Sequence, residues 1–158
     1  MPGSERQLQL TAILRGIRPH EIIDVAAALL ERGVHAIEVP LNSPEPLDSI
    51  QRLAAAFGER CLCGAGTVLQ VAQVDQVHAA GGRLLVAPNT DPAVIARALA
   101  LDMVPMPGVA SATEAFAAIA AGARELKLFP ASSYGPGHLR AARGASAAGA
   151  HARGGRRG

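Results

Sequence analysis

The residues best suited to chemistry are a lysine and a glutamate that each lie within an apolar run. Lys127 lies in LKLF (126–129) and is the only lysine among the 158 residues, where every other basic side chain is an arginine. Glu38 lies in AIEVPL (36–41). A buried carboxylate is unfavourable unless it is paired, and loss of water favours the uncharged amine of a lysine. Each residue therefore indicates a chemical role, unless Lys127 extends to the surface or Glu38 forms a structural ion pair, for example with Arg15.

The chemistry that these two side chains support is attack on a carbonyl group. An uncharged lysine amine is a nucleophile that forms Schiff bases, whereas arginine stays protonated and cannot do so. A carboxyl group in an apolar strand has a raised pKa and can act as a general acid or base near neutral pH. Lys127 and Glu38 together therefore predict a nucleophile with a proton-transfer partner.

Two further segments could bind an anion. Arg15 in ILRG has a planar guanidinium that suits a carboxylate or a phosphate, although it could also be a surface arginine after a strand. GAGTV (64–68) contains G-x-G, but Leu69 stands where the dinucleotide fingerprint requires a third glycine. We interpret it as a tight strand-to-loop turn that presents backbone N–H groups and the Thr67 hydroxyl to an anion; a purely structural turn is the alternative.

Strands and helices must alternate to position these residues. Six short apolar runs are typical of strands: 11–16, 35–41, 60–66, 83–89, 102–108 and 124–130. The segments between them have helix length and carry start and stop residues: Pro19 to Gly33, Ser43-Pro44 to Gly58, 70–80 before Gly81-Gly82, Asp91-Pro92, and a capping box at 111–114 before Gly122. This alternation predicts an α/β fold with a parallel sheet. Near-constant spacing favours a (β/α)8 TIM barrel, incomplete here at about six βα units, with the strand-end side chains gathered at one edge.

The charge distribution divides the chain in two. Residues 1–139 carry nine arginines, one lysine and 13 acidic residues, a net charge of −3, whereas residues 140–158 carry five arginines and no acidic residue. We predict a partial barrel domain over 1–139. The Ala/Gly/Arg tail over 140–158 has no large apolar side chain, so we expect it to be disordered or weakly helical. The basic tail would suit nucleic acid, but without aromatic residues or a binding motif we expect no nucleic-acid partner.

Composition limits the remaining classes. No apolar run approaches the roughly 20 residues of a membrane span, and the start lacks the apolar region of a signal peptide, so we expect a cytoplasmic protein without a membrane partner. Cys61 and Cys63 would face the same side of a strand. We interpret them as reduced, packed thiols, since no residues with metal-ligand spacing lie nearby and no metal is expected.

Six motifs in order resemble the 2-keto-3-deoxy-6-phosphogluconate/6-phosphogalactonate aldolases, from about residue 10 to residue 139. They are ILRG (13–16), IEVPLNSP (37–44), GAGTVL (64–69), APN (87–89), PG with ATEAF (107–108, 112–116) and LKLFPAS (126–132). The forms ILRG and EVPLNSP are most similar to the galactonate branch. In the gluconate branch an arginine usually follows the second strand, where this chain has Asn42. In the galactonate branch the arginine of the first strand takes over the role of that residue, and Arg15 matches this first-strand arginine.

The resemblance implies a class I aldolase that needs no metal or organic cofactor. Lys127 would attack the C2 ketone of 2-dehydro-3-deoxy-6-phosphogalactonate, Glu38 would take the C4 hydroxyl proton through a water, and pyruvate and glyceraldehyde 3-phosphate would result. The implied substrate-binding residues are Arg15 and Thr67 at the carboxylate, Pro88 and Phe129 along the pocket, and Asn42. Members of the family are commonly homotrimers.

The family pattern continues with two further strands, whose loops bind the substrate phosphate, and this pattern is lost after residue 139. We expect a truncated gene or a shifted reading frame there. Six strands would leave unpaired edges at the first and the last, so we expect little or no aldolase activity from these 158 residues. The alternatives are an aldolase for the gluconate epimer and a non-catalytic chain whose exposed sheet edges mediate association.

Overall fold

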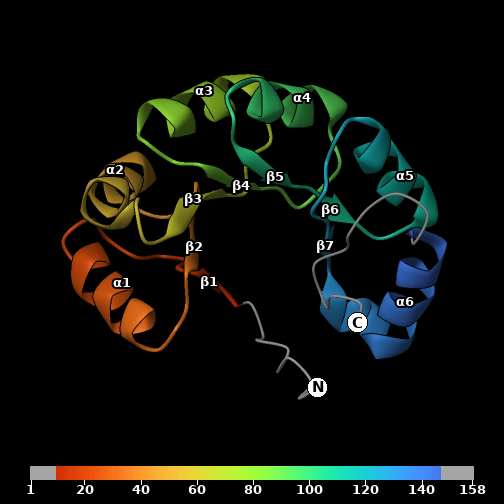
Figure 1. Ribbon diagram of the computed structural model, residues 1–158, viewed down its shortest axis with the longest axis horizontal. Coiled ribbons are helices and arrows are strands. Elements are labelled where there is room, and N and C mark those ends of the chain that lie inside the picture. Colours follow the sequence, from red (N-terminus) through yellow and green to blue (C-terminus); the bar gives the residue numbers. More distant parts are fainter. Residues whose placement is uncertain (1–9, 147–158) are drawn as a thin grey trace, which may run out of the picture.

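Strands and helices alternate along the chain in the computed structural model, which describes residues 10–146. The strands form an arc, the helices cover its outer side, and β1 and β7 lie at its two ends (Figure 1). The elements are β1 (Thr11–Ile13), α1 (Ile22–Glu31), β2 (Ala36–Pro40), α2 (Pro46–Phe57), β3 (Leu62–Gly66), α3 (Val71–Ala79), β4 (Leu84–Val86), α4 (Pro92–Ala100), β5 (Val104–Met106), β6 (Gly108–Val109), α5 (Ala112–Ala120), β7 (Lys127–Leu128) and α6 (Ala131–Ser146). The predicted α/β architecture with about six βα units is confirmed.

The strands pair in parallel within two sheets. One sheet has the order β1-β2-β3-β4-β5, and the other pairs β6 with β7. The fifth predicted strand run is divided at Pro107 into β5, which pairs with β4, and β6, which pairs with β7. The Pro107 carbonyl still accepts a hydrogen bond from the Lys127 backbone N–H at 2.9 Å.

The predicted helix boundaries are confirmed at two N-termini. Asp91 accepts hydrogen bonds from Ala93 and Val94 at the start of α4, at 2.8 and 3.4 Å. Ser111 and Glu114 form the expected capping box at the start of α5. Both caps satisfy backbone N–H groups that have no partner within the helix.

Two helices begin later than predicted. α1 begins at Ile22 rather than at Pro19, because a turn closed by the Glu21 N–H on the Arg18 carbonyl precedes it. α2 begins at Pro46 rather than at Ser43-Pro44, because Glu45 takes a left-handed conformation with φ 43°.

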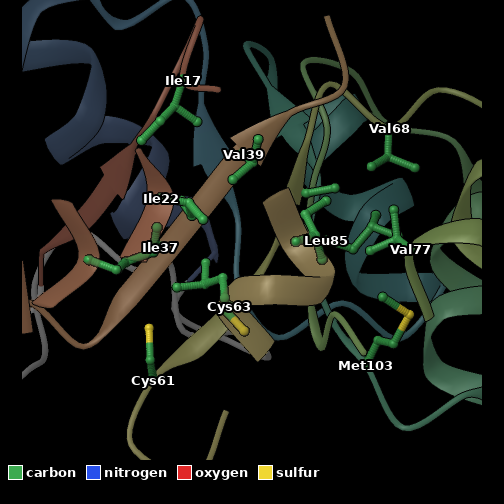
Figure 2. Packing of buried hydrophobic residues seen from close by; sticks show 14 of the residues in the cluster. Ile17, Ile22, Ile37, Val39, Cys61, Cys63, Val68, Val77, Leu85 and Met103 are labelled. Carbon is green, nitrogen blue, oxygen red and sulfur yellow. The ribbon is translucent and has the colours of Figure 1, made fainter. Parts of the chain in front are cut away.

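The main core lies between the five-stranded sheet and its helices (Figure 2). In β2, Ile37 and Val39 are fully buried in this core, so Glu38 between them points to the opposite face. Cys61 and Cys63 are free thiols buried in the same core, which confirms the predicted packing, although Cys61 lies just before the first residue of β3. Burial of each large aliphatic side chain contributes roughly 1.5–3 kcal/mol.

The last helix crosses the expected domain boundary at residue 139. α6 runs to Ser146, so residues 140–146 of the tail that we expected to be disordered or weakly helical are helical. Gly135, with φ 66°, and Pro136 interrupt the helix near its start. The rest of the expected tail, 147–158, lies outside the described residues. Between residues 10 and 146 no helix has the length and apolar character needed to span a membrane.

Candidate active site

Lys127 and Glu38 form an ion pair, although they come from different sheets. Lys127 Nζ lies 3.9 Å from Glu38 Oε1, and the two side chains are 26% and 4% exposed. Lys127 is the first residue of β7, and its neighbour Leu126 packs in a second small core with α5. The half-exposed amine can therefore meet a ligand, whereas the carboxylate is nearly closed off from water.

Burial dominates the protonation behaviour of Glu38. Loss of water raises the pKa of the Glu38 carboxyl above its ordinary value, and the positive charges of Lys127 and then Arg15 oppose this only in part. A carboxyl group with a raised pKa exchanges protons more readily near neutral pH. The structure thus combines an amine with an acid–base group at one position. The ion pair alternative for Glu38 also holds, with Lys127 rather than Arg15 as partner.

The loops after β1 and β2 are joined by two hydrogen bonds. Arg15 Nη1 donates to Asn42 Oδ1 at 2.9 Å, and the Gly16 N–H donates to Ser43 Oγ at 3.0 Å. Ser43 is buried although it is polar, and it did not figure among the predicted residues. Asn42, predicted to bind substrate directly, holds Arg15 in this structure. This bond uses one N–H of the Arg15 guanidinium. The guanidinium has further N–H donors, which remain available to an anion.

The remaining predicted residues lie at the same ends of the strands. The Phe129 ring, which is 43% exposed, has its centroid 5.1 Å from Lys127 Nζ, a distance typical of a cation–π contact. Thr67 and Pro88 follow β3 and β4 and are half-buried. Within residues 10–146 no hydrogen bond or ion pair connects their side chains to Lys127 or Glu38, so their roles stay predictions.

The GAGTV segment joins the end of β3 to a turn. β3 continues through Gly66, and the chain turns at Thr67, whose φ is 61°. The turn lies within the predicted segment 64–68, although both glycines belong to the strand, and the anion-binding role of Thr67 stays a prediction. A side chain at Gly64 would overlap the Leu84 carbonyl of β4, so this glycine permits close approach of two strands.

The titratable side chains of the described residues do not form a metal site. Between residues 10 and 146 no three His, Cys, Asp or Glu side chains are grouped so that they could hold a metal ion. The arrangement at Lys127 instead offers an amine, a carboxyl group, a guanidinium and an aromatic ring. These groups suit a small anionic carbonyl compound.

Comparison with known families agrees with this set of groups. The family model described as KDPG and KHG aldolase matches residues 4–147. This chain belongs to that aldolase family. The match includes all of the strands that carry the predicted site residues.

Individual aldolases of the family show the same likeness. The probable 2-dehydro-3-deoxy-6-phosphogalactonate aldolase of Rhizobium meliloti (strain 1021) is 52% identical over 143 residues, which cover 90% of this chain and 66% of that relative. The 2-dehydro-3-deoxy-6-phosphogalactonate aldolase of Escherichia coli (strain K12) is 46% identical over 137 residues, 87% of this chain and 67% of that relative. A solved structure, described as native KDPGal, superimposes with a TM-score of 0.84 at 43% identity and covers 91% of this chain and 69% of that one. The chain thus spans about two thirds of the length of these relatives.

Proposed function

We propose that this chain carries the Schiff-base chemistry of a class I aldolase that cleaves 2-dehydro-3-deoxy-6-phosphogalactonate to pyruvate and glyceraldehyde 3-phosphate. The observation that carries the proposal is the 3.9 Å approach of Lys127 Nζ to the buried carboxylate of Glu38. An amine that attacks a ketone and a carboxyl group that moves protons are the two groups the reaction needs.

The reaction runs through an enamine on Lys127. The amine adds to the C2 ketone and water leaves, which gives an iminium ion. Glu38, through a water, takes the C4 hydroxyl proton, the C3–C4 bond breaks, and its electron pair flows into the iminium. Glyceraldehyde 3-phosphate departs, Glu38 returns the proton to the enamine carbon, and water hydrolyses the iminium to release pyruvate. The water lost at the start is thus regained at the end.

The substrate carboxylate would be held by Arg15 and Thr67, with Pro88 and Phe129 along the pocket. Arg15 is supported by its electrostatic effect on Glu38 and by its hydrogen bond to Asn42, which orients the guanidinium. The galactonate epimer is supported by the names of the two relatives and by Asn42 where an arginine stands in the gluconate branch. The gluconate epimer is the alternative substrate.

A homotrimer in the cytoplasm completes the proposal. The family resemblance supports the trimer, and the charge of a phosphorylated sugar acid supports the compartment, since charged molecules cross membranes poorly. A second candidate, association through the sheet edges, is favoured by β1, which lies at the edge of its sheet and carries Ile13 at 50% exposure. Light scattering during size exclusion separates a defined trimer from open-ended association.

Borohydride trapping with pyruvate tests the Schiff-base step on the chain as it exists, since pyruvate needs no phosphate site. We expect a covalent adduct on Lys127, located by peptide mass spectrometry, and none in Lys127→Ala. Release of pyruvate from the two epimers, followed with lactate dehydrogenase, tests the substrate, and we expect slow turnover with preference for the galactonate epimer. A folded chain that gives no adduct would contradict the proposal.

A further inference from the structure

The Glu38 carboxylate lies over a glycine of the neighbouring strand. Gly66 ends β3, which pairs with β2 in a register that sets Glu38 opposite Gly64 and Pro40 opposite Gly66. A Cβ built on Gly66 would overlap Oε2 of Glu38. The Glu38 side chain therefore extends from its place opposite Gly64 toward the end of β3, where Gly66 lies. That Cβ would also lie 2.7 Å from Glu38 Cδ and 3.5 Å from Oε1.

The Glu38 carboxylate is what a side chain at Gly66 would meet first. The three heavy atoms nearest to a Cβ at Gly66 all belong to this carboxylate. Gly66 lies in a strand and has no positive φ, so its backbone would accept alanine without strain. The glycine is therefore required by the carboxylate and not by the backbone conformation.

The two carboxylate oxygens have different neighbours. Oε1 is the atom that lies 3.9 Å from Lys127 Nζ, and Oε2 is the atom over Gly66. The carboxylate is thus held between the amine on one side and the bare backbone of β3 on the other. With a side chain at Gly66, the carboxylate would have to move from this place.

We propose that Gly66 is a positioning residue, whose missing side chain provides the space that holds the Glu38 carboxylate beside Lys127. The inference rests on the proposed function and adds to it a role for the second glycine of the GAG segment. Gly66 acts through Glu38, by leaving the space that its carboxylate occupies. A shift of about 1 Å in a reacting group can lower a rate by roughly 10²-fold.

Exchange of the pyruvate methyl protons in D₂O, followed by NMR, tests the proton-transfer step, and borohydride trapping tests the Schiff base separately. We expect Gly66→Ala to keep adduct formation within about twofold of the parent chain, while exchange falls by roughly 10²-fold. Gly137→Ala is the matched control, since its φ is not positive and the nearest atom, Arg140 Nη2, lies 4.0 Å from a Cβ there. Exchange at the parent rate in Gly66→Ala would overturn the inference.

A thermal-stability cycle distinguishes the contact from a general effect of alanine. We expect Gly66→Ala to lower the melting temperature of the parent chain but to have little effect in a Glu38→Ala background, where the carboxylate is gone. An equal loss in both backgrounds would overturn the inference. If the parent chain forms no pyruvate adduct, the proposed function fails, and the stability cycle still decides whether Glu38 depends on Gly66.

Discussion

Lys127 Nζ lies 3.9 Å from Glu38 Oε1, and the two members of this pair differ sharply in exposure to water. The amine is open enough to meet a ketone, whereas the carboxylate lies between this amine and the backbone of β3. Because the carboxylate is desolvated, it is poised to accept and return protons. The amine would carry the covalent bond, so the two roles can be tested separately.

Lys127→Arg separates the amine chemistry from the charge. The variant keeps a positive charge beside Glu38, so the fold should be retained, but a guanidinium forms no Schiff base with pyruvate. We expect complete loss of the borohydride adduct in mass spectrometry with a melting temperature close to that of the parent chain. Arg97→Lys, which places a new amine beside Asp75 at the surface, is the control and should leave labelling at Lys127 unchanged. Labelling of the Lys127→Arg variant would disprove the assignment.

Glu38→Gln should separate adduct formation from proton transfer. The amide has the shape of the carboxyl group but cannot act as a base, and general acid–base catalysis contributes typically about 10²–10⁴-fold. We expect the pyruvate adduct to persist and cleavage or methyl-proton exchange to fall within this range. An unchanged exchange rate would assign the proton transfer to another group.

The difference in stability between the parent chain and Glu38→Gln should depend on pH in a defined direction, because only the carboxyl of the parent titrates. Burial raises the pKa of Glu38 in the folded chain, so folding favours the protonated form, and stability falls as the pH rises from the ordinary carboxyl pKa through the raised one. Below the ordinary value the carboxyl is neutral in both states. We therefore expect parent and variant to melt alike near pH 4 and the variant to melt at higher temperature near pH 8. A variant that loses relative stability as pH rises would show that the pairing with Lys127 outweighs burial.

Asn42→Ala should weaken binding of the carboxylate and spare the chemical step. The change removes the acceptor that orients Arg15 at 2.9 Å. A hydrogen bond contributes about 0.5–1.5 kcal/mol, which corresponds to a rise of roughly two- to twelvefold in the pyruvate concentration for half-maximal trapping. Asn89→Ala, after β4 in the same sheet, is the comparison. A loss of adduct at saturating pyruvate would contradict a role confined to binding.

The two thiols should be unreactive in the folded chain. Burial and the neighbouring Cys63 raise the pKa of Cys61 to about 11, against a small lowering by the Ile37 backbone, and burial also raises the pKa of Cys63. Because the thiolate is the reactive form, we expect negligible reaction with a disulfide reagent at pH 8. Both thiols should react once the chain is unfolded in denaturant. Fast labelling of the native chain would show that β3 opens readily.

The sequence predicted the alternation of strands and helices because the apolar runs and capping residues are local signals. Asp91 and Ser111 begin helices as expected, since each cap depends on residues within a few positions. The division of the fifth strand run at Pro107 was not predicted, because a run of apolar residues does not show where ladder hydrogen bonds stop. The late start of α2 at Pro46 was not predicted either, since the left-handed conformation at Glu45 has no clear sequence signal.

The candidate site was predicted in part. Lys127 and Glu38 stood out because a charged residue in an apolar strand is unusual, and the structure brings them together. Whether Glu38 pairs with Lys127 or Arg15 could not be predicted, because that depends on how the strands curve. The space at Gly66 was missed as well. The spacing of Gly64 and Gly66 was a signal for this space. Alternate residues of a strand share one face, so two glycines two positions apart leave that face of β3 without side chains.

The break between the two sheets places the reacting groups on opposite sides of a junction. Glu38 belongs to the five-stranded sheet and Lys127 to the two-stranded sheet, and Pro107 separates β5 from β6 between them. Within one sheet, hydrogen-bonded register would set the spacing of two side chains. Here the spacing depends instead on the relative orientation of the two sheets. That orientation is set by the hydrogen bonds that join β6 to the segment after β4, from the Gly108 N–H to the Asn89 carbonyl at 3.2 Å and from the Thr90 hydroxyl to the Gly108 carbonyl at 2.9 Å. The 3.9 Å separation of amine and carboxylate is therefore a direct gauge of that orientation, and a small rotation at Pro107 would alter the reaction geometry without breaking a bond inside either sheet.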